Sequence, residues 1–225
     1  MQIREWMTRN VITVTPEASL FKASKLMKEH QIRRLPVVDD QGRLIGIVSD
    51  RDVKAASPSR ATSLEMFELL YLLSEIKIRD VMTAPPVSIS PDQTVETGAL
   101  LMEEKGFGGL PVVDADNKVI GIITDYDIFK VLVDITGVRH GGLHLAFEVD
   151  DAPGALRSIF DLLHAHKADI VSTLTSVSES IRTDKRRIYI RVRSLPREQE
   201  ESLIAALSQA CALISWAHDG IQAPG

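Results

Sequence analysis

The sequence predicts an α+β protein in two unlike parts. A small unit with the order β-α-β-β-α occurs twice, and a domain with the order β-α-β-β-α-β follows it. Two observations carry this prediction: residues 3–53 align with residues 78–128 without a gap, and the apolar pattern changes after about residue 141. A chain of 225 residues has room for two domains, and 44% apolar residues can supply a core for each.

The duplicated unit is defined by identical residues at an offset of 75 positions. Internal repetition at a fixed offset indicates that one structural unit has been duplicated. The matching groups are Met7-Thr8 and Met82-Thr83, Leu35-Pro36-Val37-Val38-Asp39 and Leu110-Pro111-Val112-Val113-Asp114, Ile45-Gly46-Ile47 and Ile120-Gly121-Ile122, and Asp50 and Asp52 with Asp125 and Asp127.

Each copy predicts the same elements in the same order. In the first copy, a short strand at 11–14 leads into an amphipathic helix that carries the apolar residues of 20–27. Two apolar runs follow, at 35–38 and 44–48, and the polar loop between them is typical of a β-hairpin. A second helix is predicted to begin at Asp50. The second copy repeats this pattern, with its short strand at 87–89 and its last helix beginning at Asp125.

A strongly apolar helix is predicted between the two copies. Residues Thr62 to Glu65 match the S/T-x-x-E capping box, and the helix that follows would extend to Ile76. Apolar residues occupy nearly every face of this helix, so it should be buried on more than one side. We expect it to pack on the repeats and on a second subunit, and burial within the chain alone is the alternative.

The C-terminal part has a different pattern. Residues 143–149 alternate between apolar and polar, as in a half-buried strand, and apolar residues at helical spacing follow. Further strands are predicted at 170–175, 187–193 and 213–216, with a helix after Pro196. This is the ferredoxin-like order. The predicted boundaries are 1–56 for the first repeat, 57–77 for the inserted helix and linker, 78–138 for the second repeat and 139–225 for the C-terminal domain.

Composition argues against several classes of function. The net charge of -5 and the lack of any basic run longer than Lys185-Arg186-Arg187 argue against nucleic-acid binding. The single cysteine, Cys211, excludes an intramolecular disulfide framework and a thiolate metal cluster. Without a recognisable leader or an uninterrupted apolar span, we expect a cytoplasmic protein that does not bind membranes. No catalytic or metal-binding motif is recognisable, so we expect a protein that is not an enzyme.

The repeated motifs resemble a pair of CBS domains, also called a Bateman module. The pattern Asp-x-Pro-Gly-x-Leu at 151–156, with the element order after it, resembles an ACT domain. The order and lengths together are similar to AcuB-type proteins, which are named for acetoin utilisation. The resemblance implies an α+β fold with a tandem CBS pair and a ferredoxin-like ACT domain. It also implies a non-catalytic regulatory protein whose ligand is AMP, ADP, ATP, S-adenosylmethionine or NAD.

Ribose binding is predicted at Ser49 and Asp52 and at their counterparts Thr124 and Asp127. In each pair a carboxylate follows a hydroxyl by three residues at the start of a helix. A carboxylate can accept hydrogen bonds from both hydroxyls of a ribose, and a helix N-terminus favours a nearby phosphate. The same S/T-x-x-D pattern is also a variant of the capping box, which would satisfy only backbone donors. Its recurrence in both copies favours the ribose-binding interpretation.

The resemblance also implies positions for the phosphates and the adenine. Arg33 and Arg34 would face the phosphates in the first copy, unless they are merely two solvated arginines, whereas Gly108 and Gly109 stand at these positions in the second. We therefore predict unequal sites, with a charged nucleotide in the first copy and a less charged adenosyl ligand, or none, in the second. The adenine pocket would be formed by Val11, Ile12, Ile47, Val87 and Ile122, which would equally suit a core.

The ACT resemblance implies an effector loop with Asp151, Gly154 and Asp169. Such loops often hold an amino acid at a subunit interface, but the acidic Asp169 would repel its carboxylate. Three functions remain open: an adenosyl-ligand sensor, which is favoured, a scaffold or dimerisation protein without a ligand, and an amino-acid sensor. A homodimer is expected, and an unknown protein partner is possible under each of them.

Overall fold

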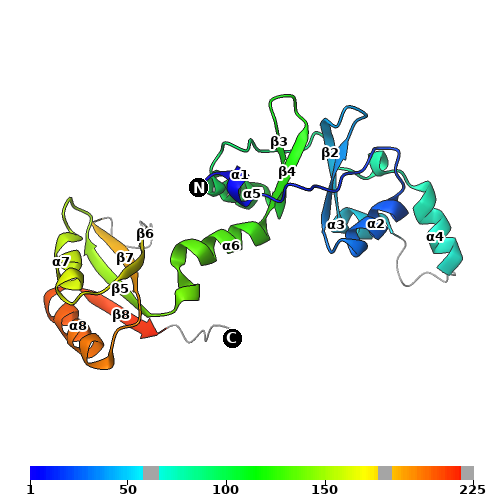
Figure 1. The fold of residues 1–225 in the computed structure, drawn as a ribbon. Coiled ribbons are helices and arrows are strands. Elements are labelled where there is room, and N and C mark those ends of the chain that lie inside the picture. Colours follow the sequence, from blue (N-terminus) through cyan, green and yellow to red (C-terminus); the bar gives the residue numbers. More distant parts are fainter. Residues whose placement is uncertain (58–65, 177–183, 219–225) are drawn as a thin grey trace. The chain divides into compact units, whose positions relative to one another are not determined.

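The computed structural model describes residues 1–57, 66–176 and 184–218, and for 66–70 it describes only the backbone. The chain divides into two compact units, Met1–Ile128 and Phe129–Gly225, which are described separately below (Figure 1). The dividing point falls inside helix α6 (Asp125–Thr136).

The first unit contains two β-hairpins, each flanked by helices, and this confirms the duplication predicted from the sequence. The registers are equivalent: Pro36 lies opposite Ile47 in one hairpin, and Pro111 lies opposite Ile122 in the other. The tips of the hairpins meet, because Leu44 N–H donates to the carbonyl of Asn117 at 2.9 Å. The elements of the first copy are α2 (Leu20–Glu29), β1 (Arg34–Val38), β2 (Leu44–Ser49) and α3 (Asp50–Ala56), and those of the second are α5 (Val95–Lys105), β3 (Gly109–Val113), β4 (Val119–Thr124) and α6.

The short strands predicted at 11–14 and 87–89 are reduced to single parallel bridges. Val14 N–H donates to the carbonyl of Pro36 at 3.1 Å, and Ile89 N–H donates to that of Pro111 at 3.0 Å. The next bond of each parallel ladder would need an N–H from the same proline, which has none. The prediction of strands was therefore wrong at these two places, because the prolines stop the ladder after one residue pair.

The segment that begins each copy pairs with the other copy. Thr8 exchanges two backbone hydrogen bonds with Ile122, at 2.9 and 3.0 Å, and Thr83 exchanges two with Ile47, at 2.9 and 3.1 Å. Each two-stranded hairpin thus gains a bridge from a segment that belongs, by sequence, to the other repeat. The sequence alignment gave no sign of this exchange.

Side-chain packing follows the same exchange. Short helices α1 (Ile3–Trp6) and η1 (Ile78–Asp80), which were not predicted, each bury one isoleucine completely. Ile78 joins the core of the first copy, and Ile3 lies against Gly98 of α5 in the second.

The two Met-Thr motifs place a methionine over a glycine of the other copy. A methyl group at Gly46 would lie 2.5 Å from the Sδ of Met82, and one at Gly121 would collide with the Sδ of Met7. Each glycine lies inside a strand, where such a residue commonly marks the close approach of another group. The recurring Ile-Gly-Ile and Met-Thr motifs are therefore parts of one contact.

Helix α4 (Met66–Glu75) lies between the copies in sequence and contacts α2. Leu73 and Ile76 pack against the core of the first copy, whereas Tyr71 is 65% exposed. The predicted helix is therefore present, and it is buried on one side in this chain. The capping box predicted at Thr62 to Glu65 lies outside the described residues, and burial of the other side by a second subunit stays a prediction.

The second unit contains a four-stranded antiparallel sheet, in the order β6 (Ile170–Ser176), β7 (Lys185–Val192), β5 (Leu143–Asp150) and β8 (Leu213–His218). Helices α7 (Arg157–Ala165) and α8 (Arg197–Ala210) lie on one face of this sheet (Figure 1). Its core consists of apolar residues from the inner face of the sheet, such as Phe147 and Ile190, and from the helices, such as Leu163 and Leu203. The predicted order β-α-β-β-α-β is present. The elements are η2 (Val138–His140), β5 (Leu143–Asp150), α7 (Arg157–Ala165), β6 (Ile170–Ser176), β7 (Lys185–Val192), α8 (Arg197–Ala210) and β8 (Leu213–His218).

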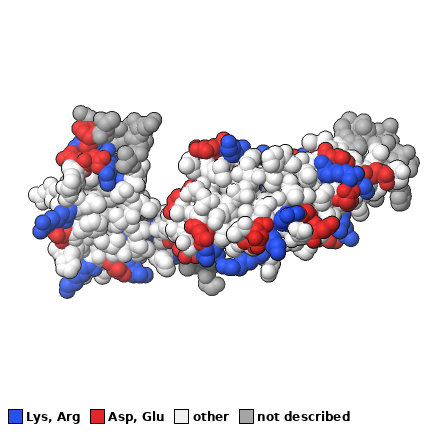
Figure 2. Space-filling model, turned by 90° about the horizontal axis from the view of Figure 1, so that it is seen from above, with Lys and Arg blue, Asp and Glu red and all other residues white. Residues whose placement is uncertain are grey.

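Three features of the described residues bear on the predicted function classes. No helix among them is long and apolar enough to cross a membrane. They contain no group of three or more His, Cys, Asp or Glu side chains that could hold a metal ion. On the face drawn in Figure 2, basic and acidic side chains are interspersed and do not form a patch of one sign.

Candidate ligand-binding sites

The predicted ribose-binding residues of the first copy form a reciprocal cap at the start of α3. The hydroxyl and the backbone N–H of Ser49 both donate to Oδ2 of Asp52, each at 2.7 Å. In return, the N–H of Asp52 donates to the hydroxyl of Ser49 at 3.3 Å. The reciprocal hydrogen bonds of a capping box are thus present, as the alternative interpretation predicted. However, Oδ1 of Asp52 accepts no hydrogen bond from any residue that the structure describes, so this oxygen can still bind a ligand.

The second copy repeats the arrangement at the start of α6. The hydroxyl of Thr124 donates to Oδ2 of Asp127 at 2.7 Å, and its N–H donates to the same oxygen at 3.0 Å. Asp127 is only 4% exposed, whereas Asp52 is partly exposed. The two boxes therefore share a geometry but differ in their access to solvent.

The five residues predicted to line the adenine pockets are all partly exposed. The chain neighbours of Ile47 and Ile122 are buried; Val48 and Ile123, for example, are 0% exposed. Because side chains alternate along a strand, Ile47 shares a face of β2 with Ser49. Ile122 and Thr124 share the equivalent face of β4. We call the pairs Ser49–Asp52 and Thr124–Asp127 the first and second ribose boxes. Ile47 and Ile122 thus each place an apolar side chain next to one ribose box and outside the core. The five residues are Val11, Ile12, Ile47, Val87 and Ile122.

The two arginines predicted for phosphate lie in different surroundings. Arg33 is exposed, and its carbonyl accepts the N–H of Asp50 at 2.9 Å. Arg34 is half-buried and lies opposite Ser49 in the ladder of β1 and β2. Its guanidinium extends to Gly108 of the second copy, where a methyl group would lie 2.9 Å from its Cζ. The structure therefore separates the two arginines that the sequence had grouped together.

The guanidinium of Arg34 is partly desolvated and lies near two carboxylates. Desolvation lowers the pKa of the Arg34 guanidinium, and the charges of Asp125 and Asp50 act in the opposite direction. Within the described part of the chain, its N–H groups donate no hydrogen bond and form no ion pair. Sequence reasoning missed Asp125 as a neighbour of Arg34, because the 75-residue alignment makes Asp125 the counterpart of Asp50 and does not show which residues meet across the copies.

The predicted effector loop of the second unit contains exposed residues with arginine partners. Asp151 forms an ion pair with Arg186, and Oδ2 of Asp169 accepts a hydrogen bond from Nε of Arg193 at 2.7 Å. Gly154 is exposed and has a φ of +85°, in the left-handed region that favours glycine. Asp151 is thus paired with a residue of β7, and Asp169 with the residue that directly follows β7.

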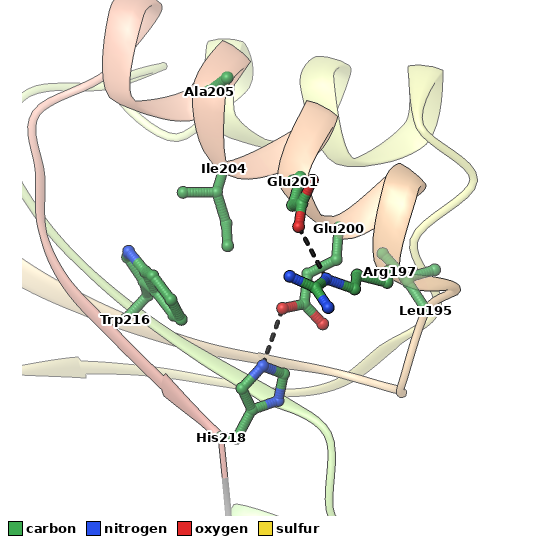
Figure 3. A pocket seen from close by; sticks show the side chains of 8 residues that line it. All are labelled: Leu195, Arg197, Glu200, Glu201, Ile204, Ala205, Trp216 and His218. Atoms are coloured by element: carbon green, nitrogen blue, oxygen red, sulfur yellow. Dashed lines mark hydrogen bonds and ion pairs between the residues drawn. The ribbon is translucent and has the colours of Figure 1, made fainter.

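Sequence reasoning also missed a groove between α8 and β8 in the second unit. The groove has a volume of about 560 Å³, and Ile204 and Trp216 provide apolar walls (Figure 3). Nε2 of His218 lies 2.8 Å from a carboxylate oxygen of Glu200. No motif marks this groove in the sequence. Its lining residues are Leu195, Arg197, Glu200, Glu201, Ile204, Ala205, Trp216 and His218.

Comparison with known proteins identifies the duplicated unit. The model of the CBS domain family matches residues 3–59 and 78–134, which is half of the chain. The chain therefore belongs to the CBS domain family, as the sequence motifs predicted. Among curated proteins, a CBS domain-containing protein of Dictyostelium discoideum is 32% identical over 133 residues, which are 59% of this chain and 92% of that protein.

Another relative matches this chain over only part of a longer protein. An inosine-5'-monophosphate dehydrogenase of Korarchaeum cryptofilum is 29% identical over 184 residues, and the match covers 77% of this chain but only 35% of that enzyme. The chain thus spans about a third of the length of that relative.

Two solved structures resemble the chain at the level of the fold and the sequence. CBSX2, a CBS-pair protein of Arabidopsis thaliana, has been solved in complex with AMP; it is 34% identical, with a TM-score of 0.50, and the match covers 60% of this chain and 97% of CBSX2. A putative acetoin utilization protein (AcuB) of Vibrio cholerae is 30% identical, with a TM-score of 0.51, and that match covers 62% and 95% of the two chains.

Proposed function

We propose that this CBS-domain protein is a non-catalytic regulatory protein that binds an adenosine-containing ligand in its CBS pair. The observation that carries the proposal is the duplicated box of hydroxyl and carboxylate, each next to a partly exposed apolar residue. The complex of CBSX2 with AMP supports an adenosyl ligand. AMP, ADP, ATP, S-adenosylmethionine and NAD all share this adenosine group.

The chemistry of the first site fits the adenine and the ribose of such a ligand. Val11, Ile12 and Ile47 offer partly exposed apolar surface to the adenine. Asp52 keeps its Oδ1 for the ribose hydroxyls while Oδ2 accepts the bonds of the cap. Capping and ribose binding are therefore compatible, because they use different oxygens of one carboxylate.

The second site offers the equivalent residues in a more closed setting. Val87 and Ile122 would contact the adenine, and Asp127 with Thr124 would hold the ribose. Because Asp127 is almost fully buried, binding there would require the surrounding side chains to move. A ligand that binds one arrangement better than the other would shift the population of the two, which is how we propose that the protein signals to its second unit or to a partner.

Calorimetry with AMP, ADP, ATP, S-adenosylmethionine and NAD tests this proposal. We expect at least one of them to bind with a dissociation constant below about 1 mM, equivalent to about -4 kcal/mol. Asp52→Ala, Asp127→Ala and the double variant should weaken or abolish binding, whereas Asp116→Ala, a change at an exposed loop aspartate, should leave it intact. Binding that survives the double variant would show that the ligand does not use these two carboxylates, and the proposed site would be wrong. No binding at all would favour a scaffold without a small-molecule ligand.

For the second unit, we propose an ACT domain that dimerises the protein or docks a partner in an AcuB-like manner, in the cytoplasm. The sheet order supports the ACT assignment. The similarity to the Vibrio cholerae protein, over 62% of this chain, supports only the comparison with AcuB. Because Asp151 and Asp169 are already paired with arginines, we do not assign an amino-acid ligand to this loop. Light scattering on the full chain tests the dimer; a monomeric mass at micromolar concentration would reject it.

A further inference from the structure

We propose that the groove between α8 and β8 of the second unit binds a small aromatic molecule that carries a protonated amine. None of the residues that line this groove belongs to a ribose box or to the predicted effector loop. The inference therefore goes beyond the proposed function and does not depend on what the CBS pair binds. The apolar walls of the groove indicate the aromatic part of this molecule, and its polar end indicates the amine (Figure 3).

The groove exists because helix α8 leaves the inner face of β8 uncovered. Leu203 and Leu207 of α8 are fully buried in the core of the second unit. β8 lies at the edge of the described sheet, and its Trp216 lies opposite Leu145, a core residue of β5, so these two side chains share the inner face. Trp216 is nevertheless 49% exposed. An edge strand thus presents a large aromatic side chain that no described helix covers.

The apolar part of the groove suits a flat ring. Ile204 from α8 and Trp216 from β8 provide its two walls. The groove volume of about 560 Å³ is within the range of roughly 300–1,000 Å³ that is usual for small-molecule sites. An aromatic ring between the walls would cover exposed apolar surface and would gain from the contact with the indole beyond the area that it buries. The walls therefore favour an aromatic ligand.

The aromatic wall and the polar end are connected by direct contacts. The rings of Trp216 and His218 meet edge to face, with 6.1 Å between their centroids and 86° between their planes. Nε2 of His218 lies 2.8 Å from a carboxylate oxygen of Glu200 on α8. These contacts hold the indole at a defined position relative to the carboxylate, as a preorganised site requires.

The carboxylate of Glu200 indicates the charge of the ligand. Its side chain is only 14% exposed, and among the described residues its one ion-pair partner is His218, which is charged only when protonated. The other charged residues of the lining, Arg197 and Glu201, pair with each other, with 2.9 Å between Nε and the carboxylate oxygen. One negative charge therefore remains at a partly shielded position, where a cation is attracted more strongly than at an exposed carboxylate. A cation is also favoured near the face of an indole.

Fluorescence of Trp216 tests the proposal in the full chain. The chain has two tryptophans, so Trp6→Phe leaves Trp216 as the single reporter. The probes are phenethylamine, phenethyl alcohol and phenylpropionate, which share a phenyl ring but are cationic, neutral and anionic. The amine should change the fluorescence saturably, with a dissociation constant of about 1–10 mM or lower, as expected for a ligand of this size. It should bind at least about threefold more tightly than the alcohol, and the acid should bind most weakly. Calorimetry on the wild-type chain repeats the comparison without a substitution.

Two pairs of variants separate the polar end from the aromatic wall. Glu200→Gln removes the charge but keeps the size, so the amine should lose its advantage while the alcohol still binds. Glu198→Gln is the matched control, because Glu198 is an exposed residue in the first turn of α8 outside the lining, and it should preserve the advantage. Trp216→Ala, measured by calorimetry, should weaken the amine and the alcohol about fivefold or more. Ile214→Ala, at an exposed residue of the same strand outside the lining, should not.

Several results would overturn the proposal. They are the absence of saturable binding of any probe, equal binding of the amine and the alcohol, and an advantage of the amine that survives Glu200→Gln. Tightest binding of the acid would assign recognition to Arg197 and would also reject it. If the amine binds more weakly as the protein concentration rises, a second copy of the chain occupies the groove and the proposal is wrong. None of these results bears on the ribose boxes, which the adenosine ligands test separately.

Discussion

The contact between Gly46 and Met82 makes the exchange between the copies testable. A methyl group at Gly46 would lie 2.5 Å from the Sδ of Met82. Heavy atoms in ordinary contact lie roughly 3.5–4.0 Å apart, so the methionine would have to retreat by about 1 Å. Overpacking of this kind costs about 1–3 kcal/mol. Alanine recovers about 0.5–1 kcal/mol of backbone entropy relative to glycine in a strand. Gly46→Ala should therefore destabilise the protein by about 0.5–2 kcal/mol.

The same substitution should have the opposite sign when Met82 is truncated. In a Met82→Ala background the collision is gone, so Gly46→Ala should stabilise by about 0.5–1 kcal/mol. A double-mutant cycle, measured by urea unfolding monitored by circular dichroism, gives the coupling as the difference between these two effects. The matched control is Met7→Ala, because Met7 lies over Gly121. In that background Gly46→Ala should remain destabilising.

Two results would refute this reasoning. If Gly46→Ala is additive with Met82→Ala, the methionine does not lie over the glycine. If it couples with Met7→Ala instead, each Met-Thr segment packs on its own copy, and the exchange seen in the structure is wrong.

Two further predictions concern the core of the first copy and a half-buried histidine of the second unit. Ile78→Ala should cost about 2–5 kcal/mol, because Ile78 is fully buried in the core of the first copy; Leu100→Ala, at a residue that is 55% exposed, is the control for the same unfolding assay, and equal losses would contradict the assignment. In the second unit, desolvation and then the charge of Arg191 lower the pKa of His144, so the unfolded chain binds its proton more readily than the folded one. This contribution to stability is fully present above the ordinary histidine pKa of about 6.5 and is lost as the pH falls through that value towards the lowered pKa. Unfolding at a series of pH values should therefore show a pH-dependent difference between wild type and His144→Gln, and an equal difference for the exposed His164→Gln would argue against burial as the cause.

Much of the fold could be predicted because its signals are local. The hairpins follow from apolar runs separated by turn residues, and the helices after them follow from Ser49 and Thr124 as N-caps. In the second unit, strict alternation along β5 and β7 marks the strands that are buried on one face. Each of these patterns depends only on neighbouring residues, so one sequence is sufficient to recognise it.

The exchange of N-terminal segments could not be predicted, because the two repeats have the same residues at equivalent positions. The sequence therefore fits packing within one copy as well as packing between the copies. Ile3 and Ile78 are identical residues at equivalent positions, so either could fill either core without changing the sequence pattern. Only the connections between the segments decide between the two arrangements. The position of the Arg34 guanidinium was missed for the same reason, since an alignment of two copies shows which residues are equivalent and not which residues meet.

The exchange also bears on how a ligand at one site would affect the other copy. Ile47, predicted to contact the adenine of the first site, exchanges hydrogen bonds with Thr83, and Ile122 of the second site exchanges hydrogen bonds with Thr8. A shift of either β-strand would therefore move a segment of the opposite repeat. Because α6 begins at the second ribose box and continues to Thr136 in the second unit, a ligand at that box contacts the start of the only α-helix that both units share among the described residues. Of the two sites, the one around Asp127 is thus the better placed to transmit binding beyond the CBS pair.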